Sequence, residues 1–148
     1  MISRTFKAAA LSALIAIGSA GAVLAQDAYE QRSEAMKAMG SMAKTIGEML
    51  QGKTDFDAEV ANAAFVKAQG SMADFATYFP EGSEGGESEA APAIWTDPDG
   101  FAEAVMKVQG DLDTAVASSP QTQDEVKAAF GLVAGNCKGC HEKYRIQK

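Results

Sequence analysis

Both cysteines of the chain and its only histidine fall within one pentapeptide near the C-terminus, at Cys137, Cys140 and His141. Residues three and four apart share one face of an α-helix, so a helix through this segment would point two thiols and an imidazole in the same direction. This C-x-x-C-H pattern is typical of covalent haem attachment, in which the thiols add to the haem vinyl groups and the imidazole binds the iron. The fold must therefore present one helix face to a haem.

Three other uses of the pentapeptide are alternatives to haem attachment. A zinc site needs four ligands, and the chain has neither a third cysteine nor a second histidine. A thioredoxin-type redox pair needs a βαβ context, which the sequence does not supply. A disulfide between Cys137 and Cys140 would have poor geometry on a helix. We therefore predict haem c, one per chain, covalently attached through Cys137 and Cys140.

The N-terminus has the organisation of a secretory signal peptide. Arg4 and Lys7 precede an apolar, alanine-rich stretch, and the small residues Val23 and Ala25 favour cleavage before Gln26. The apolar stretch is short and interrupted by glycine, which favours a cleaved signal over the alternative of an uncleaved membrane anchor. Because c-type haem is attached outside the cytoplasm, we predict a periplasmic protein without stable membrane insertion.

Removal of residues 1–25 would leave a single domain over residues 26–148. This part carries 11 basic against 20 acidic side chains, because only Arg4 and Lys7 are lost from the 13 basic and 20 acidic side chains of the full chain. Nucleic acid is not an expected partner, since phosphate binding requires a basic surface. The acidity favours solubility and predicts docking to redox partner proteins that present a basic face.

Four segments show helical periodicity, and none shows the alternation of a strand. The first covers about residues 28–50, and the second begins at Asp57, a suitable N-cap, and ends at Pro80. Apolar positions in both recur at steps of three and four, which predicts one buried stripe on each helix. The stripes are Tyr29, Arg32, Met36, Met39, Ala43, Ile46 and Leu50 in the first and Ala61, Phe65, Ala68, Met72, Phe75 and Phe79 in the second.

The third and fourth segments begin with capping signals. The run Thr96-Asp97-Pro98 supplies a cap residue and a proline for the first turn, and the run from Thr122 to Glu125 has the pattern of a capping box. The stripes are Phe101, Val105, Val108, Leu112 and Ala115 in the third and Val126, Phe130, Val133, Cys137, Cys140 and Tyr144 in the fourth. The cysteines are in phase with the fourth stripe, so the haem is expected to face the core.

The links between these segments predict how the helices are arranged. Those near residues 52–56 and 118–121 are short, which favours antiparallel neighbours. The link from Pro80 to Ile94 is longer and rich in Gly, Ser and Glu, which is typical of a mobile crossover. The predicted fold is all-α, an antiparallel four-helix bundle with covalently bound haem in the bundle core.

A C-x-x-C-H motif near the C-terminus of a four-helix chain resembles the class II c-type cytochromes, of which cytochrome c′ is the main branch. The resemblance covers residues 27–147. It includes the run 32–40, in which an arginine precedes the haem-facing residue by four, the pair Ile94-Trp95, and the run 140–145. The chain is therefore identified as similar to a family of four-helix haem proteins.

The resemblance implies roles for the residues around the iron. Cys137 and Cys140 would be the thioether anchors, His141 the proximal ligand, and Met36 the residue over the distal face. Met36 is also a candidate sixth ligand. The alternative for Met36 is a side chain that only fills the core.

Three further residues match haem contacts of the family. The resemblance implies that Arg32 and Trp95 lie near the haem edge and its propionates, and that Arg145 lies close to the proximal side. Independently, a cation on a buried stripe needs an anionic partner, and a propionate would serve Arg32. The alternatives are a local loop anchor for Trp95 and a solvated charge in the last helical turn for Arg145.

Three functions follow from these residues. Because the chain has one histidine, two histidines cannot bind the same iron. The resemblance implies a five-coordinate iron that binds nitric oxide or carbon monoxide, with one-electron transfer. The first alternative is a low-spin class II cytochrome in which Met36 binds the iron and the protein only carries electrons. The second is a haem enzyme such as a peroxidase or nitric oxide reductase, although the stripe of Met36, Met39 and Ala43 offers no acid–base group. We predict a non-enzymatic protein that carries electrons and binds gases.

Small residues also occur on the outer faces of the first two helices. They are Ala38, Gly40, Ser41 and Ala64. Members of the resembled family are often dimers through these helices, so a homodimer is an expectation beside that of ordinary helix surface.

Overall fold

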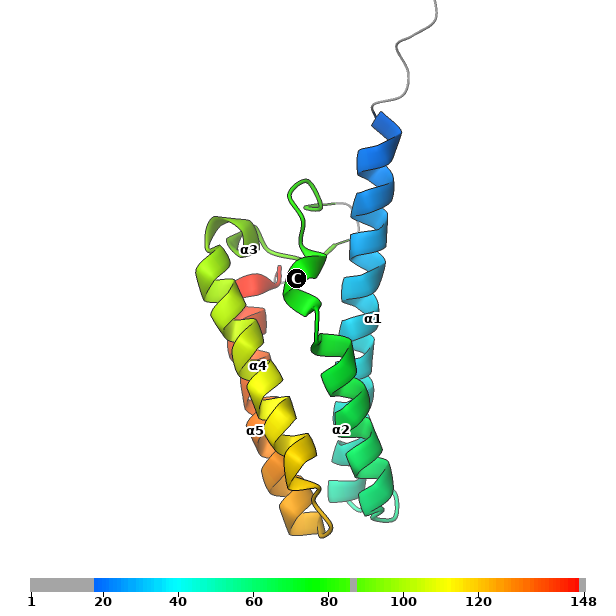
Figure 1. Ribbon diagram of the computed structural model, residues 1–148. Helices are drawn as coiled ribbons and strands as arrows, with labels where there is room; N and C mark the ends of the chain where they lie inside the picture. The colour runs from blue at the N-terminus through cyan, green and yellow to red at the C-terminus, as the bar shows by residue number, and fades with distance from the viewer. Residues whose placement is uncertain (1–17, 86–87, 147–148) are drawn as a thin grey trace, which may run out of the picture.

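The computed structural model describes residues 18–85 and 88–146. Along this part of the chain lie α1 (Gly18–Leu50), α2 (Ala58–Met72), the 3-10 helix η1 (Phe75–Tyr78), α3 (Ala93–Thr96), α4 (Pro98–Ser118) and α5 (Gln123–Tyr144). Two antiparallel pairs, α1 with α2 and α4 with α5, stand side by side (Figure 1). The predicted all-α, antiparallel four-helix bundle is confirmed.

The helix starts follow the capping signals of the sequence. Asp57 accepts a hydrogen bond from the backbone N–H of Val60, and Asp97 caps α4 ahead of a proline in the first turn. Thr122 and Glu125 form the reciprocal capping box at the start of α5. These local interactions set where each helix begins, so the helices present their apolar stripes in the predicted phase.

The core confirms the predicted stripes of α2 and α4 almost completely. All five stripe residues of α4 are buried, and so are those of the second segment from Ala61 to Phe75. Phe79 is half-buried and packs against the same core. The largest side chains with almost no exposed surface are Phe65, Ile46, Leu112, Val105, Val126 and Val133. They come from all four long helices, so one continuous core holds the bundle together.

The buried face of α1 differs from the predicted stripe. The fully buried residues of α1 recur every seven positions, at Ala28, Ala35, Met42 and Met49. Arg32 and Ile46 lie between them and are also buried. Of the predicted positions, five lie only half-buried at the edges of this face: Tyr29, Met36, Met39, Ala43 and Leu50. Ala35 lies in the core that α1 shares with the other long helices, whereas Ala28 lines the pocket beside the loop that follows η1.

Two predicted segments have different bounds in the structure. The first helix begins at Gly18 instead of near residue 28, and the second is divided into α2 and η1. Gln109 of α4 donates to the carbonyl oxygens of Met72 (2.6 Å) and Ala73 (3.0 Å), which occupies acceptors that a longer helix would use.

The crossover between the two helical pairs contains the short helix α3, which carries Trp95, where the sequence suggested only a loop ahead of the third helix. Ile94 of α3 is buried in the core, so this turn is held by packing. In the described part of the chain, no helix combines the length and apolar character that crossing a membrane requires.

Candidate functional site

The pentapeptide lies on the C-terminal half of α5, where the buried face of the helix is interrupted. Val133 and Tyr144 are buried, but no residue from 134 to 143 is fully buried. Cys140 and His141 are half-buried, and Cys137 is exposed. Cys137 was expected to lie on the buried stripe of this helix, but in the polypeptide without haem its side chain is exposed. Both thiols are accessible to a covalent partner on a stretch of helix that other side chains do not bury.

Burial also affects the protonation of the two inner groups. It raises the pKa of the Cys140 thiol, with a further contribution from Cys137, and it lowers the pKa of His141, with a further contribution from Arg145. Both effects favour the neutral forms. A neutral imidazole has a free ring nitrogen, and this is the form that binds a metal ion.

Two carboxylates, Asp111 of α4 and the α4 N-cap Asp97, hold α5 on either side of the pentapeptide. Before it, the side-chain amide of Asn136 donates to Asp111 (Nδ2–Oδ2, 2.7 Å). After it, Asp97 accepts from Lys143 (Nζ–Oδ2, 2.6 Å) and from the hydroxyl of Tyr144 (3.3 Å). The hydrogen bond from Lys143 contributes most to lowering the pKa of Asp97, which keeps this carboxylate ionised. The pentapeptide is thus placed by polar contacts with α4.

The end of α5 also pairs with the segment that precedes α3. Residues Ala90 and Arg145 form an isolated antiparallel bridge, in which Ala91 N–H donates to the Tyr144 carbonyl (3.0 Å) and Ile146 N–H donates to the Glu89 carbonyl (2.8 Å). Arg145 donates from Nε to the Glu89 carboxylate (2.7 Å). Arg145 thus lies one turn beyond the pentapeptide and forms an ion pair with Glu89.

Arg32 is buried on α1, with 6% of its surface exposed. Its guanidinium donates to the hydroxyl of Ser83 (Nη1–Oγ, 3.2 Å) and to the Ser83 carbonyl (Nη2–O, 3.1 Å), and it lies 5.0 Å from the centre of the Phe79 ring. Its Nε has no hydrogen-bond partner, and none of the ion pairs among the described residues includes it. Burial lowers the pKa of Arg32. A buried cation in this state fits an added anionic group.

Trp95 is joined to Arg32 through Phe79. The Trp95 indole donates to the Phe79 carbonyl (3.1 Å), and the two rings pack edge to face with centres 6.1 Å apart. The ring of Phe79 also packs against Phe101, with ring centres 4.8 Å apart. Phe101 packs in turn against Tyr144, with ring centres 5.2 Å apart, and Tyr144 lies about one helical turn beyond His141. This aromatic chain connects the buried arginine of α1 with the end of α5.

Met36 lies one turn after Arg32 on α1, and Met39 follows it. Both are half-buried and pack against the core that Cys140 also contacts. Met36, Met39 and Cys140 thus belong to the partly buried edge of the one core of the bundle, to which α1 contributes these two thioether side chains. Among the residues described, no group of three His, Cys, Asp or Glu side chains lies close enough together to hold a metal ion directly.

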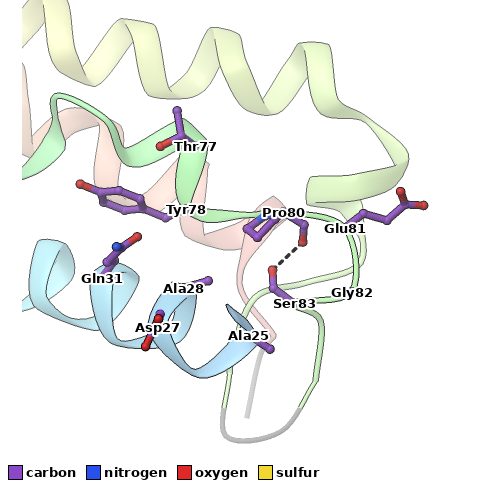
Figure 2. A pocket seen from close by; sticks show the side chains of 10 residues that line it. All are labelled: Ala25, Asp27, Ala28, Gln31, Thr77, Tyr78, Pro80, Glu81, Gly82 and Ser83. Atoms are coloured by element: carbon purple, nitrogen blue, oxygen red, sulfur yellow. Dashed lines mark hydrogen bonds between the residues drawn. The ribbon is translucent and has the colours of Figure 1, made fainter. Parts of the chain in front are cut away.

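A surface pocket of about 410 Å³ lies between the start of α1 and the loop that follows η1 (Figure 2). It is lined by Ala25, Asp27, Ala28, Gln31, Thr77, Tyr78, Pro80, Glu81, Gly82 and Ser83. The Ser83 hydroxyl donates to the Pro80 carbonyl (2.7 Å), the bond drawn in Figure 2. None of the lining residues belongs to the pentapeptide, and Ser83 both lines the pocket and accepts hydrogen bonds from Arg32.

The residues present fit a covalent haem in three respects. Two accessible thiols and an imidazole share one helix, thioether side chains of α1 pack against the core, and the Nε of a buried guanidinium has no hydrogen-bond partner. The sequence interpretation did not identify Ser83 or Asn136 as site residues. Ser83 has no sequence signal within a Gly- and Ser-rich run, whereas the position of Asn136, directly before Cys137, is a hint that was available.

A model of the family described as cytochrome C′ matches residues 27–145 of the chain. Cytochrome c-556 of Agrobacterium tumefaciens (strain II Chrys) is 36% identical over 119 residues, covering 80% of this chain and 97% of the relative. Cytochrome c′ of Rhodopseudomonas palustris is 33% identical over 141 residues, covering 95% of this chain and 96% of the relative. The match therefore extends over nearly the whole length of proteins that bear two different names.

Solved structures give the same result for the fold. Cytochrome c′ from Rubrivivax gelatinosus superposes with a TM-score of 0.74 at 33% identity, covering 82% of this chain and 96% of that chain. The nitric oxide complex of a point variant of cytochrome c′ from Alcaligenes xylosoxidans superposes with a TM-score of 0.67 at 30% identity, covering 83% of this chain and 97% of that chain.

Proposed function

The chain belongs to the cytochrome c′ family, and we propose that it is a periplasmic haem protein that binds small diatomic gases and transfers single electrons. Covalently bound haem c is the cofactor, and Cys137 and Cys140 are the two cysteines of the chain. The haem supplies a one-electron iron couple and an iron face at which a gas binds. Side chains of the bundle would hold the haem and surround the iron.

His141 holds the iron in this proposal. Its position four residues after Cys137 gives the imidazole the same helix face as that thioether, and its lowered pKa favours the neutral, metal-binding form. Arg32 pairs with a haem propionate, which would supply an acceptor for the Nε that has no hydrogen-bond partner. Trp95 and Arg145 keep the surrounding segments in place through their bonds to Phe79 and Glu89.

The apolar character of the α1 side carries the gas-binding proposal. Met36 and Met39 offer no charge and no proton there, and moving an anion into such surroundings costs far more than moving a neutral diatomic molecule. The nitric oxide complex of the similar cytochrome c′ variant from A. xylosoxidans supports the same chemistry. We therefore expect the protein to bind nitric oxide and carbon monoxide at a five-coordinate iron.

The second candidate function is a low-spin electron carrier in which the Met36 sulfur is the sixth ligand. Carbon monoxide titration of the ferrous protein separates the two functions, with Met36→Ala as the variant and Met106→Ala, an exposed methionine of α4, as the matched control. If the iron is open, the wild type binds carbon monoxide, and Met36→Ala changes this affinity by less than about tenfold, which is about 1.4 kcal/mol. If Met36 binds the iron, the wild type resists the gas and Met36→Ala gains binding.

A haem enzyme is disfavoured by the same α1 side chains. Peroxidase chemistry uses an acid–base group near the iron, and Met36, Met39 and Ala43 provide none. Turnover of peroxide or nitric oxide well above that of free haem would overturn the proposal of a gas-binding electron carrier.

Export to the periplasm rests on the signal-peptide pattern of residues 1–25 and on a mature domain over residues 26–148. Residues 1–17 lie outside the described part of the chain, and α1 continues from Gly18 through the proposed cleavage point before Gln26. The intact mass of the protein recovered from the periplasm tests this directly. We expect a mass that corresponds to residues 26–148 with one haem.

The proposed partners are redox proteins with a basic face, together with a second copy of the chain. Gly40 and Ser41 are exposed on α1, whereas Ala38 and Ala64 are half-buried. Small side chains at these positions allow close approach of another helix pair. Sedimentation equilibrium of the haem-loaded protein measures whether the homodimer forms.

A further inference from the structure

The end of α5 is held against α4 by a cluster of four residues, Asp97, Gly100, Lys143 and Tyr144, which we call the Asp97 cluster. One carboxylate oxygen of Asp97 caps α4 by accepting from the Gly100 N–H (3.3 Å). The other accepts from Lys143 (2.6 Å) and Tyr144 (3.3 Å). One side chain therefore fixes the first turn of α4 and the last turn of α5 at the same time.

The Asp97 cluster is closely packed around Gly100. A Cβ atom on Gly100 would lie 2.9 Å from the Tyr144 hydroxyl and closer still to Asp97. Tyr144 is itself buried, and its ring packs edge to face against Phe101 with centres 5.2 Å apart. The hydroxyl of Tyr144 thus reaches Asp97 only because position 100 has no side chain.

The cluster lies within one helical turn of His141. Lys143 and Tyr144 follow the histidine by two and three positions, and the His141 carbonyl accepts from Arg145 N–H (3.1 Å) in the last turn. No residue from 134 to 143 is fully buried, so Tyr144 is the first buried side chain of α5 after Val133. The turn of α5 that carries His141 is therefore anchored at Lys143 and Tyr144.

We propose that Asp97 is a positioning residue that, through Lys143 and Tyr144, sets the orientation of the His141 imidazole toward the haem iron. This inference rests on the proposed function, in which His141 is the axial ligand. The carboxylate touches neither iron nor haem in this role. It acts by fixing the turn of α5 that carries the ligand.

The single histidine of the chain makes the orientation measurable. In the oxidised holoprotein, the ring protons of an iron-bound imidazole give hyperfine-shifted nuclear magnetic resonance signals, and protein grown with ring-deuterated histidine identifies them without ambiguity. Tyr144→Phe keeps the buried ring and removes only the hydroxyl. Lys143→Met removes the ammonium group, and Lys143→Arg restores a cationic donor.

Two control variants separate positioning from charge and from loss of a hydroxyl. Lys127→Met removes the same charge from the same helix, at an exposed residue near the start of α5 and outside the pentapeptide. Tyr78→Phe removes the hydroxyl of a half-buried tyrosine of η1. Neither control alters a contact between α4 and α5.

Under this proposal, Tyr144→Phe and Lys143→Met shift the His141 ring signals by more than their line width, Lys143→Arg brings them back toward the wild-type positions, and both controls leave them in place. Variants that lower only the thermal midpoint, with unshifted ring signals, overturn the positioning role and leave the proposed function intact. A wild-type protein without hyperfine-shifted histidine signals overturns the ligation by His141 and the positioning role together.

Discussion

Arg32 of α1 and Ser83 of the crossover are 51 positions apart in the chain and are joined by two hydrogen bonds, from Nη1 to the Ser83 hydroxyl and from Nη2 to the Ser83 carbonyl. Both residues are buried. The contact fastens the crossover to α1 and leaves Nε as the unpartnered donor of the guanidinium. It therefore combines a structural role with a buried charge that has one nitrogen available to a further acceptor.

The substitution Ser83→Ala tests the structural role. It removes the acceptor of Nη1 and leaves a buried donor of a charged group without a partner, which costs about 1–3 kcal/mol. Urea denaturation of the holoprotein should show this decrease in the free energy of unfolding. Ser41→Ala, at an exposed position of α1, serves as the control and should change stability little. Equal stability of the Ser83→Ala variant and the wild type would show that the contact contributes nothing.

The charge of Arg32 is expected to affect the haem. A nearby cation stabilises the reduced, less positive iron, so Arg32→Met should lower the reduction potential by tens of millivolts, on the order of the ~59 mV that a tenfold change in a one-electron equilibrium represents. Arg32→Lys keeps the charge and should lower it less. Potentiometric titration measures the change, and an unchanged potential in Arg32→Met would argue against pairing with a propionate.

Two glycines of α4 should respond in opposite ways to alanine. Gly110 has open space where a Cβ would lie, so Gly110→Ala should stabilise the protein by up to about 1 kcal/mol through helix propensity. At Gly100 the same change forces Asp97 and Tyr144 apart and should destabilise it. Thermal unfolding of both variants measures the difference. A stabilising Gly100→Ala would contradict the close packing of the Asp97 cluster.

The capping box of α5 predicts a pH-dependent contribution to stability. The Glu125 carboxylate accepts from the backbone N–H groups of Gln121 (2.8 Å) and Thr122 (3.0 Å), and the bond from Gln121 is the largest cause of the lowered pKa of Glu125. Because the pKa is lower in the folded state, the stabilising contribution is complete above the unfolded value of about 4.3 and is lost as the pH falls through the folded value.

The corresponding variant is Glu125→Ala, whose unfolding free energy should fall below that of the wild type at pH 7 and approach it as the pH drops below about 4. Thr122→Ala removes the acceptor of the Glu125 backbone N–H and should cost about 1 kcal/mol at pH 7. Because the Thr122 side chain also contributes to the lowered pKa of Glu125, this cost should decrease in acid but should not vanish. Urea denaturation at several pH values measures both. A Glu125→Ala deficit that persists unchanged in acid would contradict the assignment.

Local signals in the sequence predicted most of the bundle. The caps at Asp57, Asp97 and Thr122 determine where three helices start, and the five apolar positions of α4 have no competing face, so their burial followed from spacing alone. The buried face of α1 did not, because Ala35 becomes part of the core only once the other helices pack on α1, and Ala28 lies beside the loop that follows η1. Spacing favours large side chains, whereas close helix packing favours small ones.

The site shows the same division. The residues of the pentapeptide share a helix by sequence, and the cap at Asp97 was indicated by the proline that follows it. The hydrogen bonds that Asp97 accepts from Lys143 and Tyr144 depend on the antiparallel register of α4 and α5, which no short run of residues encodes. Ser83 is reached from Arg32 only after the crossover folds back over α1.

The absorption spectrum of the reduced holoprotein, before and after carbon monoxide, tests the central claim most directly. With His141 on one side of the iron and the apolar side chains of Met36 and Met39 near the other, the account predicts a high-spin, five-coordinate spectrum that shifts when carbon monoxide binds. A low-spin spectrum that carbon monoxide leaves unchanged would contradict the open site and place the Met36 sulfur on the iron.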